Sequence, residues 1–313
     1  IKPAFSKDAP GAPGNMGTWQ NPQKQAYGTS VERPVWFTIA EGVVGEIAYP
    51  TVELVQTRDT YLAIETGKGV LDERTLNHKV TRLPGGLTFR TEAHGSGVNI
   101  KKEISVDSVS DAVRIDYELH FDSDQQRKIY LMHNPIAAGT AGGDGIEVVS
   151  INDNKALYAY QSDVRGDEPA ALNVGVRQLV SLSLESDIGN VGFEGVNFFG
   201  GQIYERAMSG NVAGSLMSES SGTQVKFRVL IQFSPSEGMS VLAPEQKNLM
   251  QKASSKFQAE HKAGWQKYFS KIGYRKPAGP KGDKEESSIL VLKALEDKRE
   301  VGAFIAAPAN PEL

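Results

Sequence analysis

The sequence predicts a mainly β protein in which a large antiparallel sandwich is followed by helices. Three observations support this fold class. Two stretches, 113–121 and 225–233, carry an apolar residue at every second position. Short strand-like runs separated by turn residues fill roughly the first 230 residues, as in antiparallel sandwiches. From residue 244 onward the apolar residues follow a helical period instead.

The alternating stretches predict two half-buried strands. Apolar side chains share one face in each of them: Val113, Ile115, Tyr117, Leu119 and Phe121 in the first, and Val225, Phe227, Val229, Ile231 and Phe233 in the second. A period of two is typical of a strand with one face against a core and the other in solvent.

Weaker runs predict further strands. They cover residues 35–39, 44–49, 60–65, 87–93, 128–133, 156–161 and 176–185. Turn-forming residues separate them, among them Pro84-Gly85-Gly86 and Ser221-Gly222. The strand-rich region of roughly 230 residues is larger than an immunoglobulin-type module of about 100 residues. We therefore expect one larger two-sheet sandwich.

The C-terminal part of the sequence predicts two helices. An amphipathic pattern runs from Pro244, a typical first helical residue, to Ile272, with Gly273 as its stop. A linker rich in Pro, Gly and Lys follows at 275–284, and then a second helix that carries a stripe of Ile289, Leu292 and Leu295. The last helix either begins another domain or docks back on the sandwich, and the pattern alone leaves both open.

Composition excludes several classes of protein. The 313 residues carry a net charge of −4 without a basic block, so we expect no dedicated nucleic-acid surface. No apolar run approaches the ~18–20 residues that cross a bilayer, so no membrane partner is expected. The absence of cysteine excludes disulfides, thiolate metal sites and a cysteine nucleophile. The chain opens on Ile1 rather than Met, from which we expect a secreted or periplasmic protein.

Several segments, taken in order, carry a family resemblance. They are "APGAPGNMGTW" (9–19), "GTS" (28–30), residues 35–53, "TRD" (57–59), "YERAMSGNVAGSL" (204–216) and the tail 287–313. This series resembles the N-terminal domain of bacterial glucoamylases and glucodextranases, in glycoside hydrolase family 15. The resemblance implies a β-supersandwich over 1–243, a helical linker over 244–284, and the first helix of an (α/α)6 catalytic barrel over 285–313. Residues 9–30 would then pack on the sandwich.

The resemblance also implies a function. The resemblance to family 15 implies that the chain belongs to an exo-acting, inverting hydrolase of starch- or dextran-type α-glucans. Inverting enzymes use a carboxylic acid and a carboxylate about 6.5–9.5 Å apart. In the family both are glutamates on barrel loops well beyond the first helix, so we assign no catalytic, cofactor-binding or metal-binding residue to this chain and expect no cofactor. The implied partners are a separate C-terminal catalytic chain of the same precursor and an α-glucan.

Three other functions stay open. One is an α-glucan transglucosylase of the same family. Another is a stand-alone, non-catalytic carbohydrate-binding sandwich. The third is a mutarotase-like epimerase, which would need a histidine facing a carboxylate, with His94, His120 or His133 as candidates.

The polar motifs of the sequence favour structural roles over functional ones. The carboxylates Glu41, Glu46, Glu53 and Asp59 are expected at solvated or strand-end positions. Arg58-Asp59 is a ligand clamp or, as we favour, part of a structural ion pair. The five histidines, the other two being His78 and His261, show no H-x-x-x-H spacing, so zinc is not expected.

The loop and aromatic motifs also favour structural roles. The glycine-rich 137–145 lacks the end of a P-loop, which favours a hairpin or long loop. Residues 152–154 with Asp144 suggest calcium weakly and a turn more strongly. Trp19, Trp36 and Phe37 would stack on a sugar ring or, as we favour, be buried.

Overall fold

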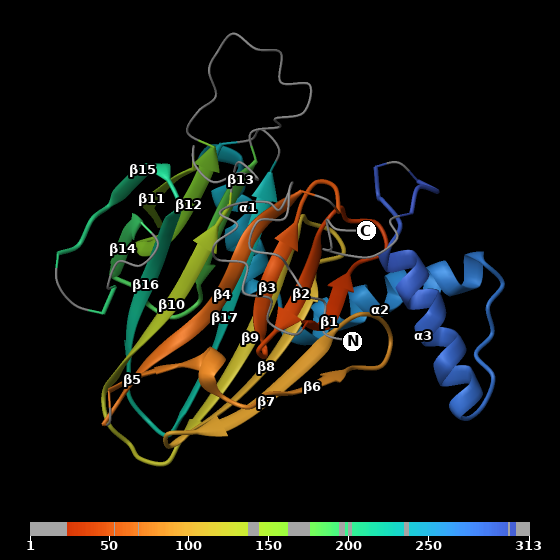
Figure 1. Cartoon of the computed structure of the whole chain (residues 1–313), viewed down its shortest axis with the longest axis horizontal. Coiled ribbons are helices and arrows are strands. Elements are labelled where there is room, and N and C mark those ends of the chain that lie inside the picture. The colour runs from red at the N-terminus through yellow and green to blue at the C-terminus, as the bar shows by residue number, and fades with distance from the viewer. Residues whose placement is uncertain are drawn as a thin grey trace, which may run out of the picture.

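The computed structural model describes residues 24–52, 54–67, 69–136, 144–161, 176–193, 198–199, 202–234, 238–299 and 301–304. In these residues two antiparallel sheets pack face to face, and three α-helices follow the last strand (Figure 1). The prediction of a mainly β sandwich followed by helices is confirmed.

The first sheet is built around the long strand β4. Its strands run in the order β1 (Lys24–Thr29), β2 (Trp36–Ala40), β3 (Val43–Ala48), β4 (Val55–Thr66), β10 (Arg127–Pro135), β16 (Val212–Ser220) and β14 (Ile188–Phe193), with β5 (Gly69–Asp72) also paired to β4. A short 3-10 helix, η2 (Glu73–Thr75), follows β5.

The second sheet is built around β17 and β9. Its order is β15 (Arg206–Gly210), β11 (Asp144–Ile151), β12 (Asn154–Gln161), β13 (Arg177–Leu182), β17 (Gln224–Ser234), β9 (Ala112–Phe121), β8 (Val98–Val106), β7 (Phe89–Gly95) and β6 (Lys79–Arg82). The two strands that this alternation predicted, β9 and β17, are therefore neighbours at the centre of this sheet.

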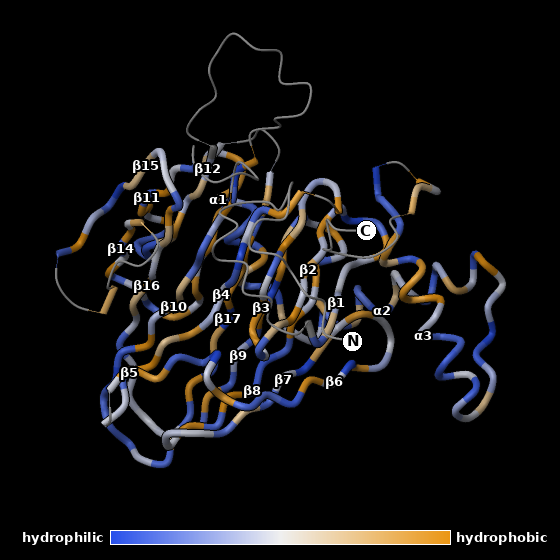
Figure 2. The backbone as a smooth tube through the Cα atoms, viewed as in Figure 1, coloured by the Kyte–Doolittle hydropathy of each residue, from blue (hydrophilic) through white to orange (hydrophobic). Residues whose placement is uncertain are grey.

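The core lies between the sheets and contains both predicted apolar faces. All ten apolar residues that the alternation assigns to one face of β9 and of β17 are buried in it. Tyr117 and Phe227 are cross-strand partners whose rings stack with centroids 5.0 Å apart. Figure 2 shows the corresponding alternation of hydrophobic and hydrophilic residues along the strands. Period-two alternation thus identified the inner face of the second sheet correctly.

Eight of the strands in the described residues were not predicted, and β16 shows why. This strand lies between β10 and β14, and seven consecutive residues from Val212 to Ser218 are buried. A strand covered on both faces does not alternate. It also contains Gly214, where an added Cβ would come within 2.9 Å of Ile146 Cδ1. The residue that packing requires here is therefore one that strand propensity disfavours.

The predicted helix 244–272 is two helices, α1 (Met239–Gln251) and α2 (Ser254–Lys271). The prediction that Pro244 opens the helix was wrong, because Pro244 lies inside α1 and costs it one backbone hydrogen bond. The stop at Gly273 is confirmed. Gly273 has a φ of 69°, and Tyr274 N donates to Phe269 O, the pattern of a Schellman end.

The last helix, α3 (Pro280–Ala294), begins earlier than predicted. Gly279 has a φ of 78° and Pro280 occupies the first helical position, so part of the predicted linker is helical. In Figure 1, α1 crosses the second sheet while α2 and α3 lie at the β1 side of the sandwich. No helix in the described part of the chain has the length and hydropathy to span a membrane.

Candidate functional site

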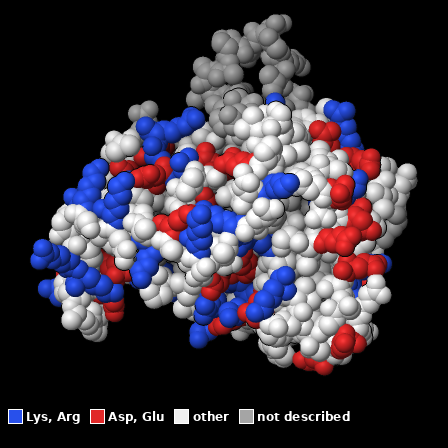
Figure 3. Space-filling view, turned by 180° about the vertical axis from the view of Figure 1, so that it is seen from behind, with Lys and Arg blue, Asp and Glu red and all other residues white. Residues whose placement is uncertain are grey.

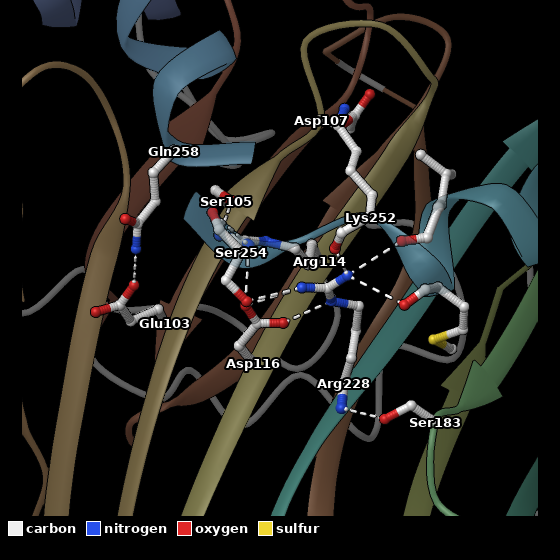
Figure 4. Close-up of polar contacts among 12 residues, drawn as sticks. Glu103, Ser105, Asp107, Arg114, Asp116, Ser183, Arg228, Lys252, Ser254 and Gln258 are labelled. Carbon is white, nitrogen blue, oxygen red and sulfur yellow. Dashed lines mark hydrogen bonds and ion pairs between the residues drawn. The ribbon is translucent and has the colours of Figure 1, made fainter. Parts of the chain in front are cut away.

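Arg228 in β17 connects the end of α1 to the second sheet (Figure 4). Its Nη1 donates to the carbonyl oxygens of Leu249 (3.1 Å) and Met250 (3.3 Å), and also to that of Lys252. The last carbonyls of a helix have no partner within the helix, and a cation there also complements the helix dipole. Arg228 therefore satisfies the end of α1 at the point where the chain turns into α2.

Asp116 in β9 holds Arg228 and the start of α2 together. It accepts hydrogen bonds from Arg228 Nε (2.7 Å), Arg114 Nη1 (2.9 Å) and Ser254 Oγ (2.5 Å). Burial alone would raise the pKa of Asp116, but the hydrogen bond from Arg228 and the charge of Arg114 outweigh it, so the pKa lies below its ordinary value. The carboxylate is ionised at neutral pH and binds both arginines.

Three cations surround the ring of Phe257 in α2. The guanidinium carbons of Arg114 and Arg228 lie 4.4 and 4.8 Å from the ring centroid, and Lys252 Nζ lies 4.3 Å from it. Lys252 also pairs with Asp107 at 2.9 Å. Because the side chain of Arg114 is fully buried, these contacts are shielded from solvent and stronger than their surface equivalents. We call Arg114, Asp116, Arg228, Lys252 and Phe257 the helix junction.

A hollow of about 410 Å³ lies beside the helix junction, and charged side chains line it. Those side chains already have ion-pair partners, some within the lining and some beside it. Glu118 accepts from Lys226 at 2.9 Å, and this hydrogen bond is the main cause that lowers the pKa of Glu118 to about 2. Figure 3 shows this side of the molecule, with acidic and basic side chains interspersed over it. The arrangement is that of a structural network.

A second contact fixes α3 to the first sheet. Trp36 Nε1 in β2 donates to the carbonyl of Ala294 at 2.9 Å, and both Leu290 and Ala294 are buried in the core. The predicted stripe is only partly right, because Leu292 is 58 % exposed, as is its neighbour Val291 at 55 %. One apolar face of α3 therefore docks on the sandwich, and a second one faces outward.

The Arg58-Asp59 motif contributes to a structural ion pair, but with a different arginine. Asp59 pairs with Arg74 at 2.9 Å and accepts from Asn134, while Asp72 binds the same guanidinium in a fork. The Arg74 guanidinium also lies 3.7 Å from the centroid of the Tyr61 ring. The structural interpretation is confirmed for Asp59.

Two of the other carboxylates lie at surface or partly exposed positions of the first sheet. Glu41 is exposed in the turn between β2 and β3, and Glu46 is half-buried in β3. Glu53 lies outside the described residues.

The structure does not bring the candidate histidines of an epimerase together. His133 is fully buried and bonded to Thr60 (2.9 Å) and Gln178 (3.2 Å), while His94 is exposed and bonded to Asn99. His120 contacts Glu118 at 3.1 Å on the open surface of the second sheet. A histidine facing a carboxylate across a cleft is thus not formed by any of the three.

The remaining histidines are also structural. His78 is buried against the carbonyl of Glu73. His261 in α2 accepts at Nε2 from Trp265 Nε1 (3.1 Å) and from the backbone N–H of Leu87 (3.2 Å). Burial lowers the pKa of both His133 and His261 to about 4, so each ring is neutral at pH 7.

The weak calcium motif is a turn, as we favoured. Asn152 and Asp153, with φ values of 51° and 70°, connect β11 to β12, whereas Asp144 lies at the opposite end of the eight-residue strand β11. Within the described ranges, no group of three or more acidic, histidine or cysteine side chains is placed to bind a metal ion. Of the glycine-rich stretch, residues 137–143 lie outside the described part, and Gly145 belongs to β11.

The aromatic candidates that the structure describes are buried. Trp36 and Phe37 are both inaccessible to solvent, which confirms the favoured interpretation and excludes sugar stacking on them. Trp19 lies outside the described residues, as does the opening segment up to residue 23.

The helix junction was missed in the sequence, although a signal existed. Arg114, Asp116 and Arg228 occupy the polar faces of the two alternating strands, which predict solvent exposure. The signal is the amphipathic helix that directly follows the sandwich. Such a helix packs its apolar face on a neighbouring surface, and the outer face of β9 and β17 is such a surface.

A family model described as glucodextranase, domain N, matches residues 9–270. The chain belongs to this family. A glucoamylase from Clostridium sp. (strain G0005) is 24 % identical over 322 residues, covering 96 % of this chain and 43 % of that protein. The chain therefore spans less than half the length of this curated relative.

Solved structures show the same fold. A bacterial glucoamylase complexed with acarbose matches with a TM-score of 0.77 at 21 % identity, covering 98 % of this chain and 45 % of that one. A family GH92 inverting mannosidase from Bacteroides thetaiotaomicron matches with a TM-score of 0.50 at 8 % identity, covering 87 % of this chain and 36 % of that one. At these identities the likeness concerns the sandwich and its helices.

Proposed function

We propose that this glucodextranase N-domain chain is the non-catalytic, N-terminal part of an exo-acting, inverting α-glucan glucohydrolase. The observation that carries the proposal is that α3 has one apolar face docked on the sandwich and another exposed to solvent. One of its faces is fixed to the sandwich through Trp36, Leu290 and Ala294, and its other apolar face exposes Val291 and Leu292. An exposed apolar face on a firmly anchored helix marks a surface for a further domain.

The lengths of the relatives support a proposal for that domain. The chain covers 43 % of the Clostridium glucoamylase and 45 % of the bacterial glucoamylase of known structure. We propose that α3 is the first helix of an (α/α)6 barrel, and that the remaining part of the enzyme completes this barrel and carries the catalytic acid and base. The substrate class would be a starch- or dextran-type glucan.

The sandwich would then hold the first helix of the barrel in a fixed position. The helix junction fixes the corner between α1 and α2, and the contact of Trp36 with Ala294 fixes the end of α3. Since a displacement of about 1 Å in a catalytic constellation can cost about 100-fold in rate, a rigid anchor for the first barrel helix has a direct catalytic value.

Two experiments test this proposal. The protein isolated from its source is analysed by denaturing intact-mass measurement, and its action on maltoheptaose and dextran is followed by NMR. A co-purifying barrel-sized chain, with release of β-glucose, is the expected result and would also support a two-chain enzyme. Hydrolysis by residues 1–313 alone would refute the proposal. Transfer of glucose to acceptor sugars in place of hydrolysis would favour the transglucosylase.

The exposed face of α3 provides a matched variant. Leu292→Asp should leave the stability of this chain unchanged but abolish its association with the barrel, because the aspartate would face an apolar partner. Val241→Asp, at a residue that is 45 % exposed on α1, is the control and should associate normally. Equal association of both variants would show that the outer face of α3 carries no partner.

A further inference from the structure

A second group of exposed apolar side chains lies at the opposite edge of the sandwich from α3 (Figure 1). It consists of Phe193 at the end of β14, Ile203 and Tyr204 just before β15, and Met208 within β15, which are 38 to 52 % exposed. We call these four residues the edge patch. Clustered exposed apolar residues on a soluble domain mark a binding surface.

The two aromatic rings of the edge patch stand on fixed backbone. Tyr204 N donates to Asn190 Oδ1 and Tyr204 O accepts from Val191 N, both at 2.9 Å, so β14 holds this residue on both sides. Phe193 Cε1 would lie only 2.7 Å from a Cβ added at Gly210, which places the ring directly against the backbone of β15. A surface whose backbone is already fixed loses little backbone entropy when a ligand covers it.

The charge of the edge patch is close to zero. Between Gln202 and Gly210 the charged residues are Glu205 and Arg206, which are adjacent and of opposite sign. Arg206 also donates to Tyr160 Oη at 3.4 Å. A neutral ligand with apolar faces and a polar rim complements this surface better than a charged one. The pyranose rings of a glucan have C–H faces for stacking and hydroxyl groups around their edge.

The rest of the enzyme is not the occupant that the geometry favours. The outer face of α3, which we assign to the barrel, lies at the other end of the molecule in Figure 1. Resting on the proposed function for the class of ligand, we propose that the edge patch is a non-catalytic surface site for an uncharged α-glucan chain. Tyr204 and Phe193 stack on successive sugar rings, and Glu205 and Arg206 bond to hydroxyl groups at the rim.

Affinity electrophoresis tests the site without any need for hydrolysis. The chain is run in native gels with increasing concentrations of soluble starch or of dextran, and its retardation gives a dissociation constant. The double variant Phe193→Ala/Tyr204→Ala should weaken binding by at least about fivefold, the scale of aromatic residues that dominate a binding surface. Phe304→Ala is the matched control, because Phe304 is 58 % exposed near α3, and its binding should be unchanged.

The outcomes separate this site from the proposed function. Retardation that the double variant loses and the control keeps supports the site, even if no catalytic partner is found. Absence of retardation, or equal retardation of both variants, refutes the site and leaves the role beside a barrel intact. Sedimentation velocity is run in parallel. Self-association that the double variant abolishes would show that the edge patch pairs two copies of the chain, which also refutes the glucan site.

Discussion

Trp36 Nε1 donates a 2.9 Å hydrogen bond to the carbonyl oxygen of Ala294, a residue 258 positions later in the chain. Ala294 is the last residue of α3, and its carbonyl belongs to the group that a helix cannot satisfy internally. Trp36 is fully buried in β2, so the bond is shielded from water. This contact ties the C-terminal end of α3 to the N-terminal part of the sandwich.

Replacing Trp36 tests that anchor. Trp36→Phe removes the donor and leaves the Ala294 carbonyl buried and unpaired, which should lower the free energy of unfolding by about 2 kcal/mol. Urea denaturation measures this loss, and hydrogen exchange should show faster exchange in α3. Tyr49→Phe is the control, because it removes a hydrogen bond to Asp111 but touches no part of α3. Unchanged protection of α3 in Trp36→Phe would contradict the anchoring role.

Replacing Arg228 tests the helix junction. Arg228→Met leaves the Asp116 carboxylate without its main partner and removes the donor to three carbonyls of the α1–α2 corner. Breaking a buried pair in this way should cost about 3–5 kcal/mol of unfolding free energy. Arg90→Met, which breaks the more exposed pair with Glu103, should cost at most about 1 kcal/mol. Equal losses in urea denaturation would show that the junction does not hold the corner.

The polar faces of β9 and β17 mark the limit of sequence-based prediction here. Alternation correctly identified Ile115 and Val229 as core residues. The same alternation placed Arg114 and Arg228 in solvent, yet α1 and α2 cover them. The period of a strand shows which side chains share a face but contains no information on what later packs against it.

Lys102 shows a second limit. It lies in β8 and is fully buried in an ion pair with Glu73, which precedes it by 29 residues in η2. Its pKa is lowered by burial, which the charge of Glu73 offsets in part. A lysine within a strand predicts exposure, and nothing in the local sequence identifies a carboxylate on another element as its partner. The edge patch was missed for the same reason, because its residues come from β14 of one sheet, from β15 of the other sheet and from the residues just before β15.

The buried histidines His78, His133 and His261 predict how stability depends on pH, because burial lowers the pKa of all three. His133 and His261 have folded-state pKa values of about 4, below the ordinary 6.5, so the unfolded chain binds more protons between these values. Stability is therefore fully present above pH 6.5 and falls as the pH is lowered toward 4, by about 1.4 kcal/mol per pH unit for each histidine. Urea denaturation between pH 5 and 7 measures this slope.

Histidine variants identify the source of that slope. His133→Gln should reduce it by the contribution of one residue, whereas His94→Gln should leave it unchanged because His94 is exposed. The comparison is made on slopes, so a general loss of stability in His133→Gln does not affect it. A slope that His133→Gln leaves as steep as in the parent chain would contradict the assignment.

Gly86 provides a test of how closely the turn between β6 and β7 approaches α2. It has a φ of +151°, and an added Cβ would lie 2.4 Å from Trp265 Cδ1 and 2.7 Å from His261 Nε2. Gly86→Ala therefore combines backbone strain with a collision against two buried rings and should cost about 3 kcal/mol. Gly222→Ala meets no atom closer than 4.0 Å at a φ of +97°, so it should cost only the backbone strain of about 1 kcal/mol. Urea denaturation measures the loss of unfolding free energy in each variant, and the difference between the two losses is the cost of the collision. Equal losses would mean that α2 moves away from the turn at little cost, and its corner with α1 would then be less rigid than a foundation for a barrel requires.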